Sequence, residues 1–395
     1  MAKLHKSSKD PELYYYFNRK KEKLWCFRHK YYDELGERKE KKRSSFTTEK
    51  EALRVLLEVK ALTLRGSSRQ IEYDSITVEK WFDLWYDTYN QQWKKSTCYH
   101  RKALIKNHIK PLLGSYKLSK LDKTTYRRAF INKLLDKGFS PNTVKLFHCI
   151  FNTAINAAVD DEVLPHNRFR KVKITKADTF ENFLTPNELN TFLDTAKEYV
   201  SVTGYTLMHL LAYTGLRKGE AYGLKWKNID FDKRTITVEC TRDHYGPRSP
   251  KTKNSYRTIP VDEVVTSQLK FYQRRCMEAK LKFGMQLNKE DDFVFISEQS
   301  GEPCSYTLLQ HAFTALYKYL ELKDIKIKKI TAHGLRHTHA TILINKRISP
   351  KTIADRLGNT VEMIYKVYAH SFKELEDTAV TVFSESLNGA KIGAN

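Results

Sequence analysis

The sequence has few cysteines and lacks the common motifs of nucleotide hydrolysis and of zinc-dependent peptide hydrolysis. Its six cysteines stand singly, with no C-x-x-C pair and no other paired spacing: Cys26, Cys98, Cys149, Cys240, Cys276 and Cys304. Such spacing argues against a disulfide framework and against a zinc site. No G-x-x-x-x-G-K-[ST] or H-E-x-x-H string occurs, which argues against an ATPase and a zinc peptidase. We therefore expect a protein that works without a metal and without a cofactor.

Long apolar runs are also missing. The first ten residues contain basic side chains but no apolar core behind them, so we expect no secretory signal. The longest stretch without a formal charge, residues 199–216, contains several hydroxyl side chains and His209. This composition predicts a buried helix and not a membrane span. We expect a cytoplasmic protein with no membrane partner.

Positive charge is abundant. The chain carries 70 Lys and Arg against 46 Asp and Glu, a formal net charge of +24 over 395 residues. Residues 1–66 hold 18 basic and 10 acidic residues, residues 67–175 hold 20 and 10, and residues 176–395 hold 32 and 26. An excess in every part indicates one long polyanion touched by several domains. The alternative is a basic surface that is merely well solvated.

The first 66 residues predict a small β-sheet backed by a helix. Residues 13–17 and 24–32 are rich in aromatic strand formers, and a third strand is expected from Arg38 to Phe46. Thr48 and Glu51 form a capping box that predicts a helix to about Leu64. The third strand carries the first candidate DNA contacts, which are Arg38, Lys41, Lys42 and Arg43. A β-strand can lie in a DNA groove, but a solvated edge strand protected by charge would have the same composition, and both interpretations stay open.

Residues 67–175 predict an all-helical domain. An apolar stripe at helical spacing begins at Val78 and continues through Trp81 and Trp85, and it indicates a core face. Further helices are expected at about 96–110, 123–137 and 141–159. A dense group of basic residues supplies the second set of candidate phosphate contacts: Lys94, Lys95, Arg101, Lys102 and Lys106. We place the last domain boundary near residue 176.

Two segments of the remaining chain combine basic side chains with tight turns. In residues 213–220 an uncharged helix ends at a glycine and presents Arg217, with Glu220 one turn later. In residues 331–340, His333 and Arg336 are three apart and share a face if the segment is helical. A guanidinium fork beside an imidazole suits the non-bridging oxygens of one phosphate. The blander interpretation of Arg217 is a solvated arginine or one paired with Glu220. For the histidines of residues 333–339, the alternative is a metal site.

A third segment carries the candidate nucleophile. Residues 357–359 read Leu-Gly-Asn, and Tyr368 follows Asn359 after nine residues. One tyrosine among 23 is usually only a packing or surface residue. The order and spacing of the three segments change that estimate. The extra histidines of the second segment, His337 and His339, are interpreted as packing or surface residues.

These residues give the chain a clear resemblance to the tyrosine recombinases of the phage-integrase type. The ordered signature of that family is matched by Arg217 in TGLRKGE, by His333 and Arg336 in HGLRH, and by Tyr368 in YAH. The family's lysine, on a hairpin ahead of an Arg-x-apolar-Pro strand, is assigned to Lys251, with Lys253 as a rival. Asn359 stands where many members have His or Trp. An amide can still hydrogen-bond to a phosphoryl oxygen, but it cannot carry a proton near neutral pH.

The resemblance implies an α+β multidomain protein. It would have an arm-type DNA-binding domain at residues 1–66 with a three-stranded sheet and a helix. A helical, SAM-like core-binding domain would follow at 67–175, and a mostly helical catalytic domain with a small antiparallel sheet at 176–395. The implied activity is site-specific recombination through a 3′-phosphotyrosine, which integrates and excises a mobile element such as a prophage or a conjugative transposon.

The same resemblance implies partners and leaves alternatives. Double-stranded DNA with core and arm attachment sites, a homotetramer on that DNA, an excisionase and a host DNA-bending protein are the partners of such an enzyme. Residues 372–387 are apolar enough to dock on a neighbouring protomer or in cis. The competing hypotheses are a metal-dependent nuclease using residues 160–162 or 291–292, and a non-enzymatic DNA-binding relic of a recombinase. Topoisomerase-like relaxation would be a side reaction of the same site.

Overall fold

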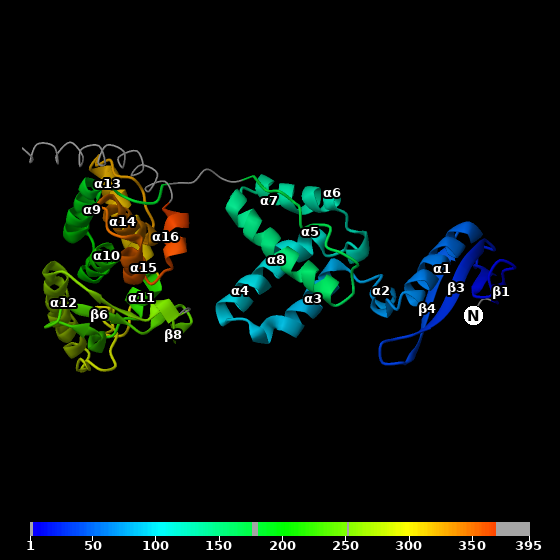
Figure 1. The fold of residues 1–395 in the computed structure, drawn as a ribbon, viewed down its shortest axis with the longest axis horizontal. Coiled ribbons are helices and arrows are strands. Elements are labelled where there is room, and N and C mark those ends of the chain that lie inside the picture. Colours follow the sequence, from blue (N-terminus) through cyan, green and yellow to red (C-terminus); the bar gives the residue numbers. More distant parts are fainter. Residues whose placement is uncertain (1–2, 176–180, 251–252, 369–395) are drawn as a thin grey trace, which may run out of the picture. The chain divides into compact units, whose positions relative to one another are not determined.

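The structure of the chain is a computed structural model that describes residues 3–175, 181–250 and 253–368, with only the backbone of Lys253. The chain divides into two compact units, Met1–Thr179 and Phe180–Asn395 (Figure 1). Each unit has hydrophobic cores of its own. The predicted division into three domains is finer than this, and its boundaries stay predictions.

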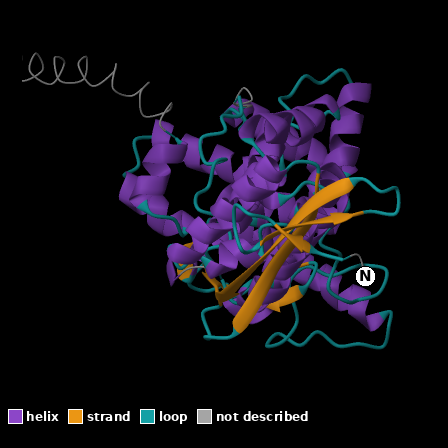
Figure 2. Cartoon of the chain, turned by 90° about the vertical axis from the view of Figure 1, so that its right-hand side faces the viewer, coloured by secondary structure: helices purple, strands orange, loops and turns teal. Residues whose placement is uncertain are grey.

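The first unit begins with an antiparallel sheet backed by a helix. Its strands lie in the order β1 (His5–Lys6), β2 (Leu13–Phe17), β3 (Lys23–Tyr32) and β4 (Arg38–Phe46), followed by helix α1 (Glu49–Leu64). Figure 2 faces this sheet, whose long strands cross the front of the view. The prediction of three strands was wrong by one, because β1 pairs only two residues with β2 and is too short to leave a pattern.

The predicted strands and helix are otherwise confirmed. The apolar side of β3, with Trp25 and Phe27, packs on the buried face of α1 around Leu56. Thr48 caps that helix, since its side chain accepts a hydrogen bond from the backbone N–H of Glu51. Strand β4 pairs only with β3 and is an edge of the described sheet, so its basic side chains stand where charge also prevents edge-to-edge pairing.

The rest of the first unit is helical, as predicted. Its helices are α2 (Ser68–Glu72), α3 (Val78–Tyr89), α4 (Lys95–Leu104), α5 (Lys110–Leu113), α6 (Lys123–Tyr126), α7 (Lys133–Asp136) and α8 (Pro141–Asp160). Two π-helical turns, η2 (Ile105–Ile109) and η4 (Arg127–Asn132), join α4 to α5 and α6 to α7. The stripe on α3 is buried, as expected for a core face.

The second unit is mostly helical with two small antiparallel sheets, which confirms that part of the predicted fold class. Its helices are α9 (Pro186–Tyr199), α10 (Val202–Thr214), α11 (Lys218–Tyr222), α12 (Glu263–Leu281), α13 (Leu308–Leu322), α14 (Ala332–Asn345), α15 (Pro350–Leu357) and α16 (Val361–Val367). One sheet has the order β5 (Ile229–Asp230), β6 (Thr235–Val238) and β9 (Arg257–Pro260), and the other pairs β7 (Thr241–Asp243) with β8 (Gly246–Arg248).

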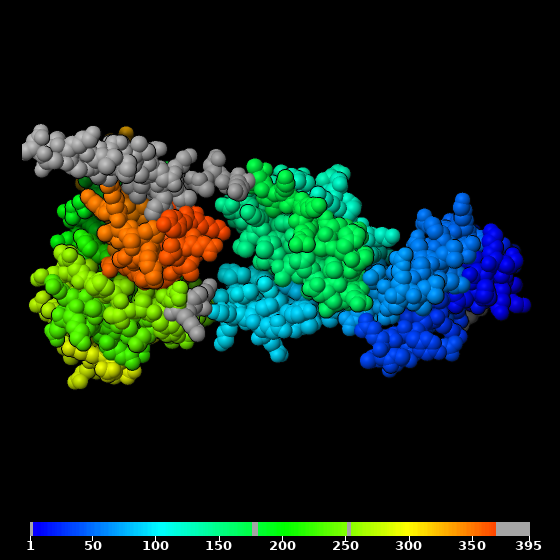
Figure 3. Space-filling view, viewed as in Figure 1, coloured from blue at the N-terminus to red at the C-terminus, as the bar shows by residue number. Residues whose placement is uncertain are grey.

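Two helices of this unit end in the same way, and both ends matter for the site. α10 ends at Gly215 and α15 at Gly358, each with φ of +65°, the left-handed conformation that favours glycine. Each turn leaves backbone carbonyls of the last helical turn without an intrahelical partner. α16 leads directly to Tyr368, which belongs to a small core with Ile344 and Leu357. In Figure 3 the orange surface of α14 to α16 is continuous with the green and yellow surface of the same unit.

Among the helices of the described residues, none combines the length and the apolar character that crossing a membrane requires.

Candidate active site

The second unit brings Arg217, His333, Arg336, Asn359 and Tyr368 into one site. Arg336 is on α14 and only 3% exposed. Its guanidinium donates from Nη1 to the carbonyl of Gly215 at 2.7 Å and from Nη2 to the carbonyl of Leu357 at 2.8 Å. Both carbonyls belong to helix ends, which carry partial negative charge. Two of its five N–H groups are used in this way.

Arg217 precedes α11 and is held on two sides. Its Nη1 donates to Glu220 Oε1 at 2.7 Å, and its Nη2 donates to the carbonyl of Gly358 at 3.0 Å and to Asn359 Oδ1 at 2.6 Å. The backbone N–H of Arg217 also bonds to the Glu220 carboxylate. The pair of Arg217 with Glu220, which was the blander interpretation of this arginine, is present, and Asn359 lies within the site.

Sequence reasoning missed two members of this network, Arg257 and Arg356. Arg257 on β9 donates to Glu220 Oε2 at 2.9 Å and to the carbonyl of Arg356 at 2.7 Å. Arg356 donates to His339 Nε2 at 3.0 Å, so that nitrogen carries no proton, and Nδ1 of His339 donates to the carbonyl of Ala212. Burial first, and then Arg356, lowers the pKa of His339 to about 4. His339 is a neutral structural residue, as interpreted from the sequence.

Glu220 is the carboxylate that balances this group of arginines. It is 2% exposed, and burial alone would raise its pKa, but hydrogen bonds and charges from Arg257 and Arg217 outweigh that effect and hold the pKa below its usual value. Burial, followed by the charge of Arg217, lowers the pKa of Arg336 to about 9, so the guanidinium stays charged at neutral pH. Of the four arginines in this network, Arg217 and Arg257 pair with Glu220. The resulting surplus of positive charge favours an anion.

Tyr368 lies beside these cations. It is 4% exposed, and its hydroxyl is 3.0 Å from Nδ1 of His337. Burial raises the pKa of Tyr368 to about 12, although the charge of Arg336 acts in the opposite direction. The interpretation of His337 as a packing or surface residue was incomplete, because its ring contacts the candidate nucleophile. The signal for this was present, since His337 follows His333 by four residues on one helix face.

His333 packs against His337 in an edge-on arrangement, with ring centroids 4.7 Å apart. Removal from water, followed by His337, Arg336 and Arg217, lowers the pKa of His333 to about 4, although much of the residue surface still reaches solvent. A neutral imidazole at this position can donate one hydrogen bond or accept one, but it adds no charge to the site.

Two predictions concern residues that the structure does not describe. Lys251 and the segment 372–387 lie outside the described residues, as does the side chain of Lys253. The strands on either side of the lysine segment are in place: β8 ends at Arg248, and β9, the predicted Arg-x-apolar-Pro strand, begins at Arg257.

The first set of candidate DNA contacts divides into exposed and paired side chains. Arg38 and Lys42 on β4 are exposed. Lys41 donates to Asp74 at 2.6 Å, and Arg43 pairs with the other oxygen of the same carboxylate. Lys41 and Arg43 thus already have an anionic partner within their own unit.

The second set shows the same contrast. Lys94, Lys95, Lys102 and Lys106 are exposed on and around α4. The guanidinium of Arg101 instead lies 4.0 Å from the ring centroid of Trp93, and burial lowers its pKa. This cation–π contact gives Arg101 a packing role beside its proposed DNA contact.

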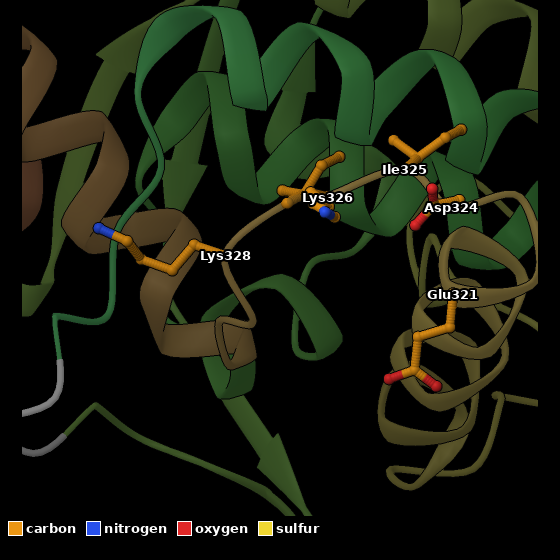
Figure 4. A pocket seen from close by; sticks show the side chains of 6 residues that line it. Glu321, Asp324, Ile325, Lys326 and Lys328 are labelled. Carbon is orange, nitrogen blue, oxygen red and sulfur yellow. The ribbon is translucent and has the colours of Figure 1, made fainter.

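The described residues also include the carboxylates of the competing nuclease hypothesis and an open surface cavity. Asp292 pairs with Lys280 at 2.6 Å, and among the described residues no group of three or more metal-ligating side chains occurs. Figure 4 shows a surface cavity of about 410 Å³ beside the end of α13, lined by Glu321, Asp324 and Lys326 among others. It contains none of the candidate catalytic residues.

Comparisons with known proteins match this arrangement of site and fold. Three family models match in order along the chain: "Arm DNA-binding domain" over residues 14–62, "Phage integrase, N-terminal SAM-like domain" over 77–135, and "Phage integrase family" over 182–374. A tyrosine recombinase XerC-like protein of Caldanaerobacter subterraneus is 29% identical over 80% of this chain and 84% of its own length. The ICEBs1 integrase of Bacillus subtilis is 28% identical over 70% and 76%.

Solved structures support the same fold. The Tn1549 transposon integrase in complex with transposon right end DNA superposes with a TM-score of 0.66 at 24% identity, covering 77% of this chain and all of that one. A lambda integrase tetramer bound to a Holliday junction gives a TM-score of 0.57 at 19% identity, covering 91% and 96%. At these identities the likeness establishes the fold alone. With the family models, the relatives and the shared fold in agreement, the chain belongs to the phage integrase family of tyrosine recombinases.

Proposed function

We propose that this recombinase cuts and rejoins DNA at specific sites with Tyr368 as its nucleophile, and that it integrates and excises a mobile element. The observation that carries the proposal is a surplus of positive charge in a site that also holds one buried tyrosine, Tyr368, beside the buried Arg336. Arg217 and Arg257 pair with Glu220, whereas Arg336 and Arg356 donate to neutral groups, namely backbone carbonyls and His339. A scissile phosphodiester would supply the missing negative charge.

The residues have distinct roles in the proposed reaction. Arg336 and Arg217 hold the non-bridging oxygens, where charge is spread in the transition state of phosphoryl transfer. His333 and Asn359 add neutral hydrogen bonds to the same oxygens. The oxygen of Tyr368 attacks phosphorus and forms a 3′-phosphotyrosine, while Lys251, or Lys253 in its place, protonates the departing 5′-oxygen. The phosphotyrosine keeps the ester bond energy, so a 5′-hydroxyl can rejoin the strand without ATP.

The proposed partners follow from the same chemistry. Exchange needs two duplexes, so we expect a homotetramer on double-stranded DNA, with the first unit gripping core and arm sites. An excisionase and a host DNA-bending protein are proposed directionality partners. Because the substrate is the DNA of a bacterial host cell, we expect the enzyme to act in the cytoplasm.

Covalent trapping tests the proposal. The full chain is incubated with labelled nicked duplexes tiled across the DNA that flanks its gene, in chelator and without ATP, and then run on a denaturing gel. We expect a retarded protein–DNA band for the wild type and none for Tyr368→Phe. DNA binding without such a band, unchanged by host extract, would favour the non-enzymatic relic.

A further inference from the structure

We propose that His337 is a catalytic residue that accepts the phenolic proton of Tyr368 during strand cleavage. This inference rests on the proposed function and assigns its proton acceptor. The geometry that carries it is the 3.0 Å contact between the Tyr368 hydroxyl and Nδ1 of His337, at a hydroxyl withdrawn from solvent. The two residues lie 31 positions apart, so the contact is a product of the fold and not of local sequence.

The tyrosine needs a proton acceptor at this position. Its pKa of about 12 keeps the phenol protonated at neutral pH. A neutral phenol is a poor nucleophile, and removal of its proton by a positioned base is the usual way to activate it. A base must lie within about 2.6–3.2 Å of the proton's heavy atom, and Nδ1 of His337 meets that requirement.

The other nearby groups suit different roles. Arg336 cannot accept a proton, and its charge favours the phenolate once that has formed. Arg217 is committed to Glu220, Gly358 and Asn359. His333 packs edge-on against the ring of His337. His333 therefore serves as a packing and hydrogen-bonding residue of the site, while His337 takes the proton from Tyr368.

The helix explains why one segment can provide all of these groups. His333, Arg336 and His337 stand at positions i, i+3 and i+4 of α14, which lie side by side on one face. Arg336 is anchored by two carbonyls at helix ends. The same anchoring holds in place the helix face that also carries His337. Because α16 ends at Tyr368, its hydroxyl is delivered to that face.

The proton and bond changes balance as follows. The phenolic hydrogen passes to Nδ1 of His337, and the oxygen forms its bond to phosphorus. The bond from phosphorus to the 5′-oxygen breaks, and that oxygen takes a proton from the lysine acid. In rejoining, the attacking 5′-hydroxyl returns its proton to the lysine, and His337 returns its proton to the phenolate of Tyr368.

A leaving-group substitution separates the two ends of this proton transfer. We would measure single-turnover formation of the covalent complex on the duplex that the wild type cleaves, made with oxygen or with sulfur at the bridging 5′ position. A thiolate leaves without protonation, because a thiol has a pKa of about 8.5. Sulfur should therefore restore the variant of the general acid, Lys251→Ala or Lys253→Ala. Sulfur should not restore the cleavage rate of a variant that lacks the base.

His337→Asn is the variant of choice, since its amide oxygen can still accept a hydrogen bond near the Nδ1 position but cannot take the proton. We expect the cleavage rate to fall about 100-fold on both substrates. DNA affinity and Tm should stay at wild-type values. His311→Asn is the matched control, because His311 is an exposed residue of α13 outside the site, and its rate should be unchanged. A second variant, His337→Ala, should regain activity as imidazole is added.

The outcomes distinguish this inference from the function on which it rests. A rate for His337→Asn within twofold of the wild type would overturn the inference and leave the proposed function intact. Restoration of His337→Asn by sulfur would also overturn it, because His337 would then serve the leaving group. If the wild type forms no covalent complex on any duplex, the proposed function fails, and the inference fails with it.

Discussion

Asn359 shows how one side chain can be oriented by its neighbour. Arg217 has only donors, so the atom of Asn359 that lies 2.6 Å from Nη2 must be the amide oxygen. The amide nitrogen is thereby turned away from Arg217 and is available to donate to a phosphate. An amide held in this way can replace the hydrogen bond of a histidine or tryptophan, although it cannot replace a proton transfer.

Asn359→Asp tests this orientation. The aspartate has the same shape, but it loses the donor and places a negative charge beside the phosphate. We expect the rate of covalent complex formation to fall about 100-fold, as for loss of one positioned donor. Asn359→His keeps a donor and should stay within tenfold of the wild type. Equal rates for Asn359→Asp and the wild type would show that the amide does not contact the phosphate.

The sequence predicts the site residues that have a fixed order along the chain and misses those that are recognised only by contact. Arg217, His333, Arg336 and Tyr368 could be assigned because their spacing follows a known signature. Arg257 is 37 positions from Glu220 and 99 from Arg356, and no local pattern reports such pairings. His337 was undervalued for the same reason, because its partner Tyr368 is 31 positions away, just after α16.

Helix ends organise the site at the scale of elements. The carbonyls that hold the two central arginines come from Gly215 at the end of α10 and from Leu357 and Gly358 at the end of α15. A Cβ at Gly358 would lie 2.8 Å from the backbone oxygen of Asn254, so glycine is needed there for space as well as for its positive φ. The ion pair of Glu220 with Arg257 then connects α11 to β9.

Glu220→Gln tests how much the ion pairs of Glu220 stabilise the second unit. The variant keeps the shape of the side chain but leaves the cations around it without their carboxylate. Breaking a buried pair in this way costs about 3 kcal/mol, which corresponds to a fall in Tm of roughly 6–12 °C for a unit of this size. Thermal unfolding followed by circular dichroism gives the shift.

Glu278→Gln provides the control, because Glu278 forms an exposed ion pair with Arg275. Exposed ion pairs contribute little to the free energy of unfolding. Its Tm should stay within about 1 °C of the wild type. A similar shift for both variants would contradict the view that Glu220 is the carboxylate on which the arginine group depends.

Elements with strong local signals were predictable, and weak ones were not. Segments rich in aromatic residues placed β2 and β3, and Pro141 after Ser140 placed the start of α8. Strand β1 pairs only two residues with β2. The π-helical turns at 105–109 and 127–132 were hidden inside segments that the sequence predicts as continuous helices, since a single wider turn does not disturb an apolar stripe enough to be seen.

Over the whole molecule, the basic excess of each segment supports the proposal that the chain contacts DNA outside its catalytic site as well. The net charge of +24 is a property of the sequence, but the structure adds which cations have partners. Lys41 and Lys110 have carboxylates beside them. Lys42 and Lys102 are exposed. Charge counting alone gives these lysines equal weight, whereas contacts to phosphate should come mainly from the exposed ones.

The salt dependence of DNA binding measures this difference. Each phosphate contact contributes about 0.9 to the slope of log K against log salt concentration. We therefore expect Lys102→Ala to reduce the slope by about 0.9 and to weaken binding equally on specific and unrelated duplexes. Lys110→Ala is the matched control, because its Nζ lies 2.8 Å from Asp83 and 3.4 Å from Glu79, and its slope should stay at the wild-type value. Fluorescence anisotropy from 50 to about 300 mM salt covers the useful range. Equal slopes for Lys102→Ala and the wild type would show that the basic group around α4 does not contact DNA. A reduced slope for Lys110→Ala would show that DNA displaces Asp83 and Glu79 from Lys110.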